Sequence, residues 1–240
     1  MGVTLEVCVD TAEGLAQAVA GGADRIELCA ALAVGGLTPS AGLMALAAGC
    51  GVPVVAMIRP RAGDFVWSEA EVGMMEAEIA SARDAGLAGV VLGASLPDGR
   101  LDVPALRRLV AVATARAGSF ELVLHRCIDL APDMLAALEE ALALGFHRVL
   151  TSGGETTAEA GAARIAALIA RAAGRITVMP GSGVNPGNAA MLKGLGINEI
   201  HASCSVSTAV SGRVVEMGFA PPVQRQTHAD AVRALRKALE

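Results

Sequence analysis

The chain has 240 residues, a net charge of −5 and only 2% aromatic residues. A net negative charge gives no basic field for a phosphate backbone, and so few aromatic side chains leave little to stack on bases, so we expect no nucleic-acid partner. No run approaches the roughly 18 apolar residues that a membrane-spanning helix needs, so we expect no membrane partner either.

Short apolar runs alternate with longer, alanine-rich amphipathic segments along the whole chain. The apolar runs have the length and the Val, Leu and Ile content of buried parallel strands, and the longer segments have helical periodicity. The expected strands span residues 5–10, 25–29, 54–59, 89–93, 121–127, 149–152, 176–180 and 199–203. The expected helices span residues 11–21, 40–50, 68–86, 102–117, 132–145, 157–172, 186–195 and 228–239.

Capping residues and glycines support these boundaries. Polar or proline residues that suit a helix start occur at Pro39-Ser40, Ser68 with Glu71, Pro132-Asp133 and Asn185-Pro186. Glycines that suit a helix end occur at Gly21-Gly22, Gly86, Gly145 and Gly174. The pattern therefore predicts discrete strand–helix units.

Eight strand–helix units predict a parallel sheet closed into a (β/α)8 TIM-type barrel, with residues 1–240 as a single domain. An open dinucleotide-binding sheet is the weaker alternative, because the turn after the first strand has no G-x-G-x-x-G. The segment 205–227 is the longest expected loop, and it would form a lid or a subunit contact.

Side chains of a barrel strand alternate between the interior and the surrounding helices. The helix-facing positions must be apolar, so the polar positions should point inward. The inward set is Glu6, Cys8, Asp10, Arg25, Glu27, Cys29, Met57, Arg59, Val123, His125, Cys127, Glu199, His201 and Ser203. Buried charges need partners, so we expect acid–base pairs among Glu6, Glu27, Arg25 and Arg59, which form either a structural network or a binding site.

A Glu-x-Cys pattern occurs on the first two strands, at Glu6-Val7-Cys8 and Glu27-Leu28-Cys29. Neighbouring strands lie about 4.8 Å apart, so in matched register the Cys8 and Cys29 sulfurs would come close together. Two thiolates are soft ligands that select Cu(I), and the Met57 thioether could be a third. The alternative is that both cysteines are small packing residues.

Candidate anion-binding residues follow strands three, seven and eight. Arg59 and Arg61 suit a carboxylate or a phosphate, although a salt-bridged loop would explain them equally well. The turn at Gly181, Ser182 and Gly183 can form a nest of backbone N–H groups, which Ser203 would complete. The inward guanidinium of Arg25 is a further candidate.

Catalytic groups could be drawn from the same interior. His125 and His201 could act as acid and base with Asp10, Glu27 or Asp129 as partners, and Cys8 or Cys29 could be a nucleophile. Each histidine could equally be a hydrogen-bonded structural residue. No pattern specifies a reaction or implies an organic cofactor. The five widely spaced cysteines lack a CxxC pair and favour a reducing cytosol.

Several long motifs resemble those of the copper homeostasis CutC family. They are LEVCVD (5–10), GGADRIELC (21–29), GGLTPS (35–40), MIRPR (57–61), HR (125–126), RVLTSG (148–153) and VMPG (178–181). The resemblance implies a TIM-like barrel, a cytoplasmic location, a homodimer or higher homo-oligomer, and copper handling through Cu(I) bound by Cys8 and Cys29. An enzyme acting on a small anionic metabolite remains the alternative hypothesis.

The chain departs from the family pattern at three places. Cys127-Ile128-Asp129 follows the His-Arg pair where Ala-Phe-Asp is expected. The strand-seven turn reads Gly181-Ser182-Gly183 rather than three glycines, and Cys204 and Val206 stand where small or basic residues are common. These departures concern an anion site and leave Cys8 and Cys29 unaffected.

Overall fold

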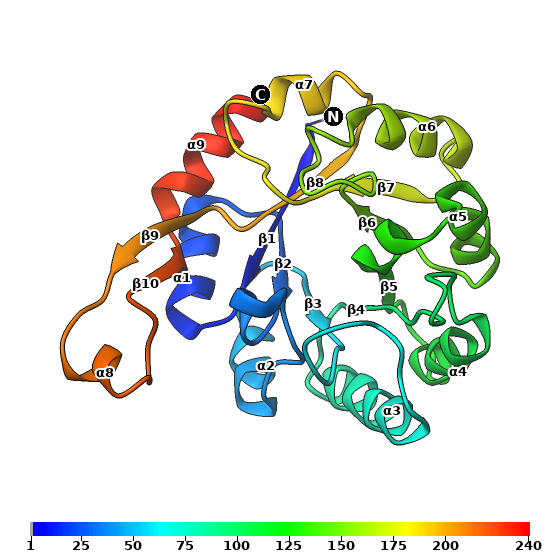
Figure 1. Ribbon diagram of the computed structural model, residues 1–240, viewed down its shortest axis with the longest axis horizontal. Helices are drawn as coiled ribbons and strands as arrows, with labels where there is room; N and C mark the ends of the chain where they lie inside the picture. The colour runs from blue at the N-terminus through cyan, green and yellow to red at the C-terminus, as the bar shows by residue number, and fades with distance from the viewer. Residues whose placement is uncertain (1) are drawn as a thin grey trace.

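A ring of eight parallel strands lies at the centre of the computed structural model, which describes residues 2–240 (Figure 1). The strands are β1 (Thr4–Val9), β2 (Arg25–Leu28), β3 (Val54–Met57), β4 (Gly89–Leu92), β5 (Glu121–Leu124), β6 (Arg148–Thr151), β7 (Thr177–Pro180) and β8 (Glu199–Ala202). Each strand from β1 to β7 pairs with its neighbour in sequence, and β1 also pairs with β8. Contacts between β7 and β8 nearly close the ring, which confirms the predicted (β/α)8 architecture.

Helices surround this ring on the outside (Figure 1). They are α1 (Ala12–Gly21), α2 (Ala41–Ala47), α3 (Glu69–Asp84), α4 (Val103–Thr114), α5 (Met134–Ala143), α6 (Ala162–Ala172), α7 (Ala189–Lys193) and α9 (Ala229–Leu239). Two short 3-10 helices follow strands, η1 (Leu32–Val34) after β2 and η2 (Arg126–Leu130) after β5. In the described part of the chain, no helix has the length and apolar content needed to cross a membrane.

Three of the four expected helix starts are confirmed by their hydrogen bonds. Ser40 caps α2, Ser68 forms a capping box with Glu71 at α3, and Asp133 caps α5 through two backbone N–H groups. The expected start at Asn185-Pro186 is wrong, because the Asn185 side chain accepts from Gly187 N in a local turn. Helix α7 consequently begins at residue 189.

The apolar core has two layers, which divide the interior of the barrel unevenly. The larger layer lies between the strands and the helices, and a smaller cluster fills part of the interior. The inner cluster consists of Cys29, Val55, Met57, Val91, Val123, Leu150 and Met179, most of them on β3 to β7. The side formed by β8, β1 and β2 carries the buried residues Glu6, Arg25, Glu27 and His201.

The expected inward direction of Cys127 is wrong. Strand β5 ends at Leu124, and η2 then turns the chain out of the strand direction. Cys127 therefore packs in the outer apolar layer.

The expected loop at residues 205–227 is a β-hairpin. Strands β9 (Ser205–Ala209) and β10 (Val223–Thr227) pair antiparallel, and the short helix α8 (Arg213–Glu216) lies in their connection. Figure 1 shows the tip of this hairpin projecting away from the barrel. Met217 and Phe219 near the tip are exposed, Phe219 to 79%. The hairpin thus adds an apolar protrusion beside the mouth of the barrel.

Candidate functional site

A cavity of about 1210 Å³ opens at the carboxyl ends of the strands, where β10 also contributes to the wall. Cys8 and the four candidate acid–base residues Asp10, Glu27, His125 and His201 all line it. Barrel enzymes place their reactive groups at this end of the strands. The cavity therefore gathers side chains from both sides of the barrel interior.

Three possible metal ligands meet on the polar side of this cavity. One atom each from Cys8, Glu27 and His201 lies within 4.8 Å of the others, and all three residues are buried. They come from the neighbouring strands β1, β2 and β8. The expected matched register of Cys8 and Cys29 differs from the observed one, because Cys8 lies opposite Glu27. Cys29 lies two residues further along and is outside this group.

His201 is held between two carboxylates. Its Nδ1 lies 2.8 Å from Glu6 Oε1, and its Nε2 lies 3.7 Å from Glu27 Oε2. Burial lowers the pKa of His201, but interactions with Cys8 and Glu27 and the hydrogen bond to Glu6 leave that pKa well above its ordinary value. His201 is therefore positively charged at neutral pH.

The two glutamates that flank His201 respond to burial in opposite ways. Burial raises the pKa of Glu6, but the hydrogen bond with His201 and the charge of Arg25 prevail and lower it to about 2. Burial also raises the pKa of Glu27, and there the net shift stays upward. Glu27 Oε1 is buried and has no hydrogen-bond partner among residues 2–240. Glu6 is thus a satisfied carboxylate and Glu27 an incompletely satisfied one.

The opposite end of the barrel interior holds a network of ion pairs. Arg25 contacts Glu6, with Nε 2.5 Å from Oε2, and it also contacts Glu199. Arg148 joins Glu199 at 3.0 Å and also pairs with Glu121. Arg148 was not predicted from the sequence, although strand alternation places it on the same inward face of β6 as Leu150. Arg25 is bound in this network and does not line the mouth cavity.

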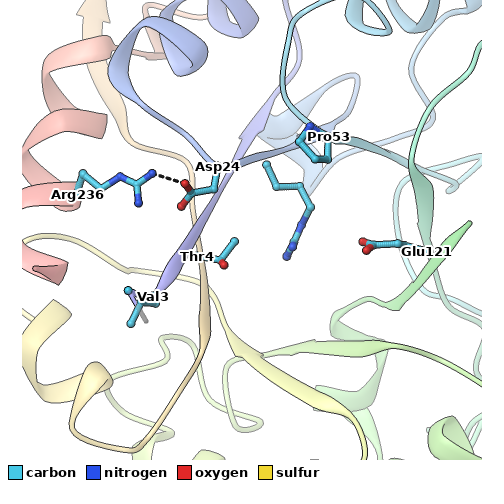
Figure 2. Close-up of a pocket in the computed structure, with 8 residues that line it drawn as sticks. Val3, Thr4, Asp24, Pro53, Glu121 and Arg236 are labelled. Carbon is cyan, nitrogen blue, oxygen red and sulfur yellow. Dashed lines mark hydrogen bonds and ion pairs between the residues drawn. The ribbon is translucent and has the colours of Figure 1, made fainter. Parts of the chain in front are cut away.

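A second cavity, of about 450 Å³, lies beside this network at the amino ends of the strands. Figure 2 shows the Glu121 carboxylate directed inward from β5 and Asp24 paired with Arg236 of α9. The conspicuous charges here already have protein partners. The residues at this end therefore serve to stabilise the fold, whereas the mouth of the barrel contains polar groups without partners.

The two candidate arginines after β3 have different surroundings. Arg59 is buried and donates to the carbonyl oxygens of Val34, Gly36 and Gly63. The expected ion pair of Arg59 is therefore wrong within the described chain, because carbonyl groups take the place of a carboxylate. Arg61 lies outside the cavity and pairs with Glu71 at 2.5 Å, as a salt-bridged loop residue would.

Only part of the expected anion nest reaches the cavity. Ser182, Gly183 and Ser203 line it, and the first two have positive φ angles. Gly181 instead donates its N–H to Thr151 O at 2.9 Å and packs against His201. A Cβ at Gly181 would come within 2.6 Å of Leu150 Cδ1, so a larger residue would have to displace the Leu150 side chain.

His125 presents one free nitrogen. Its Nδ1 accepts from Cys127 N at 3.1 Å, and its Nε2 is buried with no partner among residues 2–240. Burial lowers the pKa of His125 to about 3, with a further contribution from the positive charge of Arg59. The ring is therefore neutral, with its proton on Nε2.

Asp129 is a structural residue rather than a free carboxylate. It accepts hydrogen bonds from the Thr151 hydroxyl, Ser152, Gly154 N and Arg126. These bonds tie η2 to the loop after β6. Arg126 and Arg225 also line the mouth, and sequence reasoning missed both. Arg225 lies on the hairpin, where no strand periodicity was recognised.

Comparisons with known proteins agree with these features over nearly the whole chain. The CutC family model matches residues 3–206. A family protein CutC of Rhizobium meliloti (strain 1021) is 53% identical over 99% of this chain and 96% of its own length. A family protein CutC of Caulobacter vibrioides (strain NA1000 / CB15N) is 48% identical over 98% of this chain and 97% of its own length.

A solved structure from Streptococcus agalactiae, described as a candidate copper homeostasis protein CutC, superimposes with a TM-score of 0.79. It is 31% identical and covers 85% of this chain and 99% of its own. The family model ends at residue 206, within β9. The remainder of the hairpin and α9 thus lie beyond that model, although the Rhizobium relative aligns over nearly the whole chain.

Proposed function

The chain belongs to the CutC family, and from this premise we propose that it serves copper homeostasis by binding Cu(I) at the mouth of its barrel. The observation that carries the proposal is the group formed by Cys8, Glu27 and His201, with one atom of each within 4.8 Å of the others. Copper is here the cargo of the protein.

The donor types suit a soft cation. Thiolate sulfur and imidazole nitrogen both bind copper well, whereas carboxylate oxygen prefers harder ions. Cys8 lines the cavity next to His201, and its Sγ also makes a weak contact with Ala202 O at 3.9 Å. We therefore assign Cys8 and His201 as the principal ligands. Glu27 would balance the charge of the bound ion.

Cys29 is a second thiol next to this group, though not a member of it. Its Sγ lies 3.5 Å from Glu27 Oε2, so the Glu27 carboxylate stands next to both cysteine-bearing strands. Burial and the Glu27 charge raise the pKa of Cys29 well above its ordinary value, which disfavours the thiolate in the metal-free protein. Cys29 should therefore contribute less to affinity than Cys8 does.

Glu6 orients the histidine ligand. It contacts His201 Nδ1, and carboxylates commonly orient metal-binding histidines through this nitrogen while the other nitrogen binds the metal. The ligand nitrogen would be Nε2, which must first lose its proton. Cu(I) then competes with a proton that His201 holds tightly, so affinity should rise with pH.

Anaerobic Cu(I) titration against a chromophoric chelator tests the proposal. Cys8→Ser should weaken binding by about tenfold or more, and Cys29→Ser should weaken it less. Cys50→Ser is the matched control, because Cys50 follows α2 and does not line the cavity. Unchanged stoichiometry and affinity in Cys8→Ser would exclude this site.

The same titration at several pH values tests the role of His201. Wild-type affinity should increase from about pH 6 to about pH 8, because the imidazolium must be deprotonated before it binds. In His201→Gln the dependence should become shallower. A pH profile identical to that of wild type would remove His201 from the ligand set.

We further propose a cytoplasmic location and a homodimer or higher homo-oligomer. Five free cysteines are compatible with a reducing compartment. The exposed apolar side chains of the hairpin, Phe219 above all, offer a surface for a second copy. Light scattering of the purified chain would contradict the oligomer if it gave a mass of 24.1 kDa.

A further inference from the structure

Two buried hydrogen-bond donors without partners lie on the β3–β5 side of the mouth cavity. They are Arg59 Nε and His125 Nε2, neither of which has a hydrogen-bond partner within residues 2–240. Both residues line the cavity, and they are only 5% and 3% exposed. Buried polar groups are nearly always hydrogen-bonded in folded proteins, so two orphans at one cavity indicate a missing acceptor.

The His125 ring is fixed in the orientation that leaves Nε2 free. Its Nδ1 accepts from Cys127 N, which sets the tautomer with the proton on Nε2. A Cβ at Gly93 would lie 2.4 Å from Cε1 and 2.6 Å from Nδ1, so this edge of the ring packs tightly against the end of β4. The Phe65 ring lies over it at a centroid distance of 4.5 Å. His125 is thus a neutral and immobile donor.

Arg59 has a positive charge that no carboxylate neutralises. Its two terminal nitrogens are occupied by the carbonyl oxygens of Val34, Gly36 and Gly63. Within the described chain, carbonyl oxygens and no carboxylate accept from Arg59, and Nε is the one guanidinium nitrogen without any hydrogen-bond partner. These bonds hold the guanidinium in place beside Phe65 at 5.1 Å from the ring centroid. The charge and the free donor together call for an anionic acceptor.

We propose that this side of the cavity binds the carboxylate of a small monocarboxylic acid, whose two oxygens accept from Arg59 Nε and His125 Nε2. Two donors match two carboxylate oxygens, whereas a buried phosphate would need more. Apolar atoms of Met57, Phe65 and Leu150 line the same cavity and suit a hydrocarbon portion. Asp10 and Glu27 also line it and disfavour a second negative group on the ligand.

This binding is independent of copper, so it is tested on metal-free protein in the presence of a chelator. Thermal unfolding is followed with sodium salts of monocarboxylates such as acetate, lactate, pyruvate and butyrate, with inorganic phosphate and chloride at matched ionic strength as references. At least one monocarboxylate should raise the unfolding temperature, because a ligand that binds only the folded state stabilises it. The dissociation constant then comes from calorimetry.

His125→Asn isolates the proposed contact. The asparagine oxygen can still accept from Cys127 N, but the Nε2 donor is lost, so affinity should fall about tenfold or more. Monocarboxylate affinity should fall by a similar factor in Arg59→Lys. This second variant keeps the test decisive if one of the two folds poorly. Arg61→Lys is the control and should bind as wild type, because Arg61 lies outside the cavity. No monocarboxylate effect, an equal effect of phosphate or chloride, or unchanged affinity in His125→Asn would each overturn the proposal.

Discussion

The two ends of the barrel interior hold the same kinds of side chain in opposite states. At the amino ends of the strands, Arg25 and Arg148 form ion pairs with Glu6, Glu199 and Glu121. Arg148 Nε makes no well-aligned hydrogen bond, but it lies 3.0 Å from Glu199 Oε2 and so still faces a carboxylate. At the carboxyl ends, atoms of Glu27, Arg59 and His125 are buried without hydrogen-bond partners among residues 2–240. Buried charge by itself therefore does not mark a functional site. Buried charge whose partners are missing is the better marker.

The physical difference is one of compensation. A buried guanidinium contributes to folding only where carboxylates replace the water that it has lost, as they do around Arg25. At the mouth the same desolvation is left partly uncompensated, and this lowers stability in exchange for groups that can bind a ligand. Barrels of this type generally show this division between a stabilising end and a reactive end.

The largest expected effect comes from removing Arg25 from the ion-pair network at the amino ends of the strands. Arg25→Met would leave Glu6 and Glu199 without their shared partner inside the barrel. His201 still contacts Glu6 and Arg148 still contacts Glu199, so the free energy of unfolding should fall by up to about 3–5 kcal/mol, the cost of removing one partner from a buried ion pair. Urea denaturation measures it. A loss below about 1 kcal/mol would mean that water or rearrangement satisfies these carboxylates, and the two ends would then not differ in kind.

A smaller effect, of the opposite sign, is expected at the mouth. Glu27→Gln removes a carboxylate that burial penalises, so at pH 7 unfolding free energy should be unchanged or rise by about 1 kcal/mol. Because the pKa of Glu27 is raised in the folded protein, ionising Glu27 lowers the free energy of unfolding at pH values above its unfolded-state pKa. The advantage of Glu27→Gln should therefore shrink as the pH falls and Glu27 becomes protonated in the wild type.

Glu6→Gln is the matched comparison within the same barrel. The pKa of Glu6 is lowered to about 2, so its stabilising contribution is present above the unfolded value and is lost as the pH falls toward about 2. Glu6→Gln should therefore be destabilising at neutral pH, and less so in acid. Denaturation curves between neutral and acid pH distinguish the two glutamates. Parallel pH profiles for the two variants would contradict the proposed difference between the Glu6 and Glu27 carboxylates.

The smallest expected effect comes from the loop arginine outside the cavity. Arg61→Met removes partly exposed pairs with Asp64 and Glu71, whose side chains are exposed to 64% and 21%. Such pairs contribute at most about 1 kcal/mol, so the denaturation midpoint should move little. Carboxylate affinity should stay within about twofold of wild type. If Arg61→Met weakened carboxylate binding as strongly as Arg59→Lys, the ligand site would extend beyond the cavity described here.

Local patterns in the chain were enough to identify the fold and the composition of its interior. Eight apolar runs separated by capped, amphipathic helices specify strand–helix units, because periodicity and capping depend on residues only a few positions apart. Alternation along each strand also assigned Glu6, Glu27 and His201 to the interior. The inward direction of a strand residue is a property of its own segment, which is why it could be predicted.

Tertiary structure decided which of these side chains meet. Alternation tells whether a side chain points inward but not at what height along the barrel, and the stagger between β1 and β2 brought Glu27 rather than Cys29 opposite Cys8. Likewise, the carbonyls that hold Arg59 come from η1 and neighbouring turns, whose backbone geometry no periodicity encodes. Strand register and the path of a loop are fixed by closing the whole ring, so the unpartnered atoms that define the site emerge only in three dimensions.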